Sequence, residues 1–92
     1  GRPDRKVTSS LLAALHDDAP SIRLAAVEAL GALGDDYCLP AVMARLDDEE
    51  VDVAKAAVYA VYQLGGENAL RDLLLRENLP QFLREELEGY IP

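Results

Sequence analysis

The sequence contains few of the residues on which several classes of protein depend. It has one cysteine, Cys38, which cannot form a disulfide within the chain, whereas small secreted domains usually need several. Its apolar runs are only a few residues long, far short of the roughly 20 residues that span a bilayer. We also expect no signal peptide. These shortages together predict a cytoplasmic protein that does not associate with membranes.

Basic residues are also scarce. The chain has nine Lys and Arg residues against seventeen Asp and Glu residues, which gives a formal net charge of −8 at pH 7. Such a surface repels the phosphate backbone of nucleic acids and cannot release its counterions. The charge therefore argues against a nucleic-acid partner and favours a basic partner.

Leucine and alanine supply most of the apolar mass. Half of the 92 residues are hydrophobic, but only 5% are aromatic, a composition typical of packed helices and not of a sheet. A compact chain of this length buries only about 60–65% of the surface that its unfolded form exposes. We therefore expect one all-α domain with a thin core.

One segment of the sequence occurs twice in tandem without gaps. At an offset of 31 residues, Ala-Ala-Val at 25–27 aligns with Ala-Ala-Val at 56–58, and Leu-Gly at 33–34 aligns with Leu-Gly at 64–65. A third copy begins in register and then loses a residue. Self-similarity at a fixed period is the signature of repeat proteins. We predict a linker or cut edge at residues 1–6, then a repeat domain at 7–92 with units at about 7–34, 35–65 and 66–92, the last degenerate and capping.

Each unit shows the pattern of two helices. Pro20 favours a helix start because proline in the first turn loses no needed N–H, and Gly34 favours its end. The apolar spacing between them predicts one buried face, made of Ile22, Ala25, Ala26, Ala29, Leu30 and Leu33. Over the whole chain, the same signals predict six short helices in three antiparallel pairs, at about residues 4–16, 20–33, 36–46, 51–64, 68–76 and from Pro80 onward.

The repeated unit resembles the HEAT repeat, in particular the short HEAT-like repeats of phycobilisome lyases. The residues that match are Leu15, Asp17, Pro20, Ile22, Arg23, Ala26, Ala29, Leu30, Leu33, Gly34 and Asp35. The resemblance covers about residues 7–76. It implies a right-handed α-solenoid with the first helix of each pair on the outer side and the second on the inner side. It also implies that Arg23 reaches acidic turn residues such as Asp17 or Asp48 and ties adjacent units together.

Candidate catalytic groups do not form a motif. His16 is the only histidine, and Ser9, Ser10 and Cys38 stand in no pattern that activates a nucleophile. The acidic run at residues 47–52 could attract a cation, but it lacks the alternating ligands and central glycine of a calcium loop. We expect it to cap the helix that follows. The sequence thus predicts a protein that is not an enzyme and has no cofactor and no metal site.

A binding surface is predicted on the second helices, on the side opposite the expected buried face. Tyrosine is favoured in binding hot spots because it combines a large area with a polar end, and apolar residues accompany two tyrosines there. The predicted partner-binding residues are Leu24, Val27, Glu28, Lys55, Val58, Tyr59 and Tyr62. Two alternatives stay open: another segment of the chain covers this strip, or the chain is a structural capping fragment of a longer HEAT-repeat protein, such as a lyase-type or other enzyme subunit, with no binding site of its own.

Overall fold

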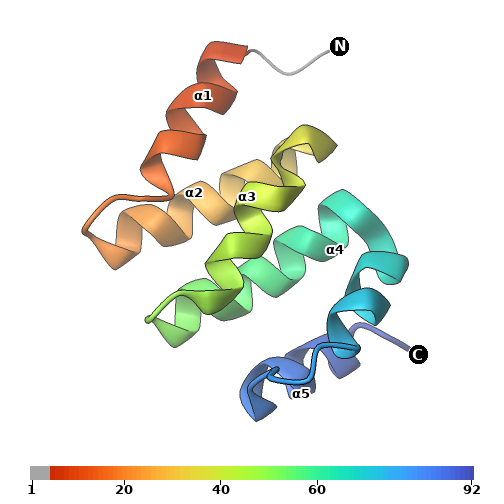
Figure 1. The fold of residues 1–92 in the computed structure, drawn as a ribbon. Coiled ribbons are helices and arrows are strands. Elements are labelled where there is room, and N and C mark those ends of the chain that lie inside the picture. The colour runs from red at the N-terminus through yellow and green to blue at the C-terminus, as the bar shows by residue number, and fades with distance from the viewer. Residues whose placement is uncertain (1–4) are drawn as a thin grey trace.

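The computed structural model describes residues 5–92, and within that range the chain forms helices and no strands (Figure 1). The α-helices are α1 (Arg5–Ala14), α2 (Pro20–Leu33), α3 (Leu39–Ala44), α4 (Val51–Leu74) and α5 (Gln81–Gly89). The all-α fold predicted from composition is confirmed. Residues 1–4 of the predicted linker lie outside the described residues, and Arg5 and Lys6 already belong to α1.

Helix α2 has the two ends that its sequence predicts. Pro20 stands in its first turn, after an extended Ala19 at φ −80° and ψ 119°. Gly34 follows its last residue at φ 74°, a left-handed conformation that residues with a Cβ rarely adopt. Both boundaries are therefore set by local backbone preference.

Helix α4 corrects the predicted number of helices. The segments expected at 51–64 and 68–76 are joined into one element, bent at Gly66, whose backbone lies at φ 71° and ψ −170°. Only glycine adopts this region readily, so the predicted break is in the right place. No separate loop follows it, since helical residues stand directly on both sides of Gly66, and α4 changes direction in Figure 1.

The segment predicted as one helix at 36–46 is less regular. Its centre is the short α3, and 3₁₀ turns at Asp36–Cys38 and Arg45–Asp47 flank it. The Asp35 carboxylate accepts a hydrogen bond from the Tyr37 N–H at 3.1 Å. Asp35 therefore caps this segment.

The helices stack as pairs. Helices α2 and α4 pack side by side, α1 packs against α2, and both α3 and α5 pack against α4 (Figure 1). The described residues measure 35 × 30 × 18 Å, so the shortest dimension is close to two helix diameters. This two-layer stack of helical pairs is an α-solenoid.

The buried faces of α2 and α4 differ from those predicted. Val27 and Val58, expected to be exposed, are fully buried, whereas Ile22 and Leu33, expected to be buried, are 44% and 39% exposed. Gly31 on the same helix is also buried. The prediction assumed one buried side for each helix. In the stack, a second helix contacts its own first helix and also its neighbours, so its buried arc is wider and turned from the predicted direction.

Candidate protein-binding face

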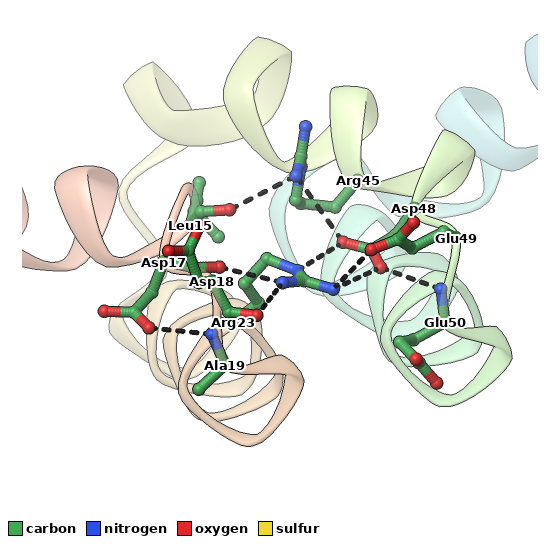
Figure 2. Close-up of polar contacts among 9 residues, drawn as sticks. All are labelled: Leu15, Asp17, Asp18, Ala19, Arg23, Arg45, Asp48, Glu49 and Glu50. Atoms are coloured by element: carbon green, nitrogen blue, oxygen red, sulfur yellow. Dashed lines mark hydrogen bonds and ion pairs between the residues drawn. The ribbon is translucent and has the colours of Figure 1, made fainter.

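Arg23 joins the first two units through the turn that precedes α4 (Figure 2). Its Nε donates to Asp48 Oδ2 at 2.9 Å and its Nη2 to Asp48 Oδ1 at 3.1 Å, a two-point geometry that is stronger than a single hydrogen bond. Its Nη1 donates to the backbone carbonyls of Asp17 at 2.8 Å and Asp18 at 3.1 Å. The predicted contact of Arg23 with the acidic turns is confirmed, and at Asp17 the acceptor is the backbone oxygen.

The pairing shifts the ionisation of both partners. Burial alone would raise the pKa of Asp48, but hydrogen bonds from Arg23 and from the Glu50 N–H, together with nearby positive charge, outweigh it and leave that pKa below its ordinary value of 3.8. The hydrogen bond with Asp48 is the main cause that raises the pKa of Arg23. Both groups are therefore charged at neutral pH.

The acidic turn is organised by side chains that accept backbone hydrogen bonds. Asp48 Oδ1 accepts from the Glu50 N–H at 2.9 Å, and Asp17 Oδ1 accepts from the Ala19 N–H at 2.9 Å. Arg45 reinforces the junction by donating to the Leu15 carbonyl at 3.2 Å. The predicted side-chain capping of α4 by residues 47–52 is not found, because Glu50, the residue before α4, makes no side-chain cap. Asp48 instead orders the turn that precedes the helix. The arginine and its acidic partner act as a structural tie.

The two side chains considered for catalysis, Cys38 and His16, differ in solvent exposure. Cys38 is fully buried, and burial raises the pKa of its thiol. His16 is exposed at the edge of the polar cleft around Arg23. Within residues 5–92, no three His, Cys, Asp or Glu side chains are grouped in a way that could hold a metal ion.

The predicted binding residues divide into two groups. Glu28, Lys55, Tyr59 and Tyr62 are exposed and Leu24 is half-buried, with Tyr59 at 49% and Tyr62 at 37%. Val27 and Val58 belong to the core instead, as described above. We name the side that carries Leu24, Glu28 and Tyr59 the α2–α4 face.

Helix α5 covers one side of this surface, through residues that the sequence prediction did not include. Tyr90 stacks on Tyr59 with a centroid distance of 5.7 Å, and meets Tyr62 edge-on at 5.5 Å. Burial is the main cause that raises the pKa of Tyr90. Lys55 Nζ lies 3.6 Å from Glu86 Oε1. The alternative that another segment covers the strip therefore holds for the side toward α5, while about half of Tyr59 stays exposed.

Two pockets lie between α2 and α4 on the uncovered side. The larger, about 280 Å³, is lined by Glu28, Ala32, Ala56, Tyr59 and Gln63. The smaller, about 230 Å³, is lined by Pro20, Ser21, Leu24, Glu50, Asp52 and Val53. Ala32, Gln63 and Asp52 were not predicted as site residues. Their helical spacing from Glu28 and Tyr59 was a signal that could have identified them.

The fold defines a class, the helical-repeat solenoids. The family of HEAT repeats matches residues 8–89, and the chain belongs to it. No curated protein matches the sequence. The finer resemblance to the repeats of phycobilisome lyases stays a prediction, as do the unit boundaries. Among the described helices, none has the length and apolar character needed to cross a membrane.

Proposed function

We propose that this HEAT-repeat domain is a non-catalytic interaction module that binds a protein or peptide on the α2–α4 face. The pair of pockets between α2 and α4 carries the proposal, since it gives an exposed and shaped surface next to a half-exposed tyrosine. HEAT repeats commonly mediate protein–protein interaction, and solenoids use such extended surfaces for it.

Charge supports a basic partner. Glu28, Glu50 and Asp52 line the two pockets, and Lys55, the cation beside them on α4, is paired with Glu86. The whole chain carries a net charge of −8. Complementary charge accelerates association and disfavours acidic competitors, so the partner segment should be positively charged and its association should slow as salt increases.

To test the proposal, a displayed library of random 12-residue peptides is selected for binding to the 92-residue chain. Binding is then mapped by amide chemical shifts of the ¹⁵N-labelled protein. We expect the selected peptides to be basic and to shift amides around Leu24, Glu28 and Tyr59. Tyr59→Ala should weaken binding about tenfold or more. The matched control is Tyr37→Ala, because Tyr37 is 63% exposed and lies in the 3₁₀ turn before α3.

Three results would contradict the proposal. Shifts confined to α1 and α3 would place the interaction surface on the opposite layer. Equal loss of affinity in Tyr59→Ala and Tyr37→Ala would remove the special role of the α2–α4 face. Failure of every selected peptide to bind would favour the structural alternative, a capping unit without a binding site.

A further inference from the structure

The larger pocket of the α2–α4 face combines three groups that suit a guanidinium. Glu28 supplies a carboxylate, Tyr59 an aromatic ring and Gln63 a carboxamide, and all three line the same space of about 280 Å³. We propose that this pocket receives an arginine side chain presented by the bound protein or peptide. The inference rests on the proposed function and specifies the chemistry of its partner.

The carboxylate of Glu28 is available to a cation. Glu28 is exposed, and it has no ion-pair partner among the described residues. Lys55 does not neutralise it, because its ammonium group lies 3.6 Å from the Glu86 carboxylate. Glu50 and Asp52 in the neighbouring pocket add negative potential. A cationic side chain is therefore attracted to this part of the face.

The ring of Tyr59 is held in place before any ligand arrives. Tyr90 stacks on it at 5.7 Å with an interplanar angle of 24°, yet Tyr59 remains 49% exposed. One side of the ring is thus supported and the rest is open toward the pocket. A guanidinium stacks well on an aromatic face, and a ring that is already ordered loses little conformational entropy on binding.

Gln63 provides a second acceptor beside the contact of the two helices. A Cβ atom placed on Gly31 would lie 2.3 Å from Gln63 Oε1, so this oxygen lies against Gly31 of α2. A guanidinium has five N–H donors in a planar fork, which can reach a carboxylate and an amide oxygen while the plane stacks on a ring. An ammonium group is a point charge and cannot make all three contacts in this way.

The size of the pocket suits one side chain. Small-molecule sites usually measure about 300–1,000 Å³, and this pocket of about 280 Å³ lies at the lower end and is lined in part by the small side chains of Ala32 and Ala56. The second pocket, with Leu24 and Val53 in its lining, lies one helical turn away along α2 and offers room for a neighbouring residue of the same partner.

The inference is tested with single-residue probes on the ¹⁵N-labelled 92-residue chain. N-acetyl-arginine methylamide should shift the amides of Glu28, Ala32, Tyr59 and Gln63 with saturable binding. The citrulline analogue has the same shape without the charge. We expect this analogue and the lysine analogue each to bind at least about fivefold more weakly than the arginine probe.

Two variants distinguish binding in this pocket from a general attraction to the negative charge of the protein. Glu28→Gln should weaken the arginine probe about fivefold and abolish its advantage over citrulline. Glu88→Gln is the matched control, since it makes the same charge change at an exposed position on α5, and it should leave binding unchanged. Both variants should melt like the parent because both side chains are exposed.

The possible failures are distinct. Equal binding of arginine and citrulline, equal binding of arginine and lysine, or equal effects of Glu28→Gln and Glu88→Gln would each overturn the arginine pocket. If the selected 12-residue peptides still bind the α2–α4 face in that case, the proposed function stands and only this inference fails. If neither the peptides nor the probe bind there, both fail.

Discussion

At the scale of single residues, the pair of Arg23 and Asp48 carries the main polar tie between units. The side chains of these residues are only 7% and 2% exposed, and the guanidinium also bonds two backbone carbonyls of the preceding turn. A buried charge of this kind is tolerated only while its partner is present. Losing one member leaves the other buried without compensation.

Asp48→Asn should therefore lower the free energy of unfolding by about 2 kcal/mol, measured by urea denaturation at pH 7. The neutral amide can still accept the Glu50 N–H, but it cannot balance the charge of Arg23. Asp47→Asn is the matched control, because Asp47 is exposed and its loss should have little effect. Equal effects of the two substitutions would contradict the assigned role of Asp48.

The same pair predicts a pH dependence whose sign follows from the pKa of Asp48. In the folded chain this pKa is lower than its ordinary value of 3.8, so the unfolded chain binds the proton more readily. The stabilising contribution is complete above about pH 5 and is lost as the pH falls through the folded-state pKa. The stability difference between the parent and Asp48→Asn should shrink below pH 4 and stay constant between pH 5 and 8.

At the scale of helices, Gly31 determines how closely α2 and α4 approach. A Cβ on Gly31 would lie 3.0 Å from both the Cα and the Cβ of Ala60, which is tighter than nine in ten real Cβ contacts. Gln63 can move away, but the backbone of α4 cannot move without shifting its other contacts. Glycine at this position is therefore required by packing and not by backbone conformation.

Gly31→Ala should reduce stability by about 1 kcal/mol. Overpacking destabilises by about 1–3 kcal/mol, and the better helix propensity of alanine offsets up to about 1 kcal/mol of this loss. The control is Gly89→Ala at the end of α5, where an added Cβ meets nothing within 4 Å, so that only the propensity gain remains. Thermal melts of the two variants should move in opposite directions, and two stabilised variants would mean that the helices can separate at little cost.

At the scale of the whole molecule, α4 is the element on which the stack depends. It contacts α2, α3 and α5, and its buried residues Ala57, Val58 and Val61 are all fully shielded from solvent. The first helix, α1, packs only on α2 among the major contacts. Damage in α4 should therefore spread to the whole stack, while changes on the outer side of α1 should remain local.

Ala57→Leu should lower the free energy of unfolding by about 1–3 kcal/mol, because three additional carbon atoms are forced into a filled contact. Hydrogen exchange should show faster opening in α2 and α5 together. The same substitution at Ala13, which is exposed on α1, is the control and should change neither measurement. Faster exchange confined to α4 would contradict the idea that the stack opens as one unit.

Much of the fold was predictable because its signals are local. The 31-residue repeat can be read directly from the sequence. Pro20 and Gly34 act through local backbone preferences, and α2 begins and ends where they predict. The break at Gly66 has the same origin. The link between Arg23 and Asp48 was expected from the family resemblance, and its two-point geometry is present in the structure.

The sequence by itself therefore determined that the chain is helical, where α2 begins and ends, and the acidic character of the surface. Only the tertiary structure decided which side of each second helix is free. Val27 and Val58 are apolar enough to belong to a binding surface. They are buried because α2 and α4 each pack against several neighbouring helices. Tyr59 stays half exposed because α5 places Tyr90 on only one side of it. Periodicity reports that a helix has an apolar side, whereas the number and direction of the helices packed around it set how wide that side is.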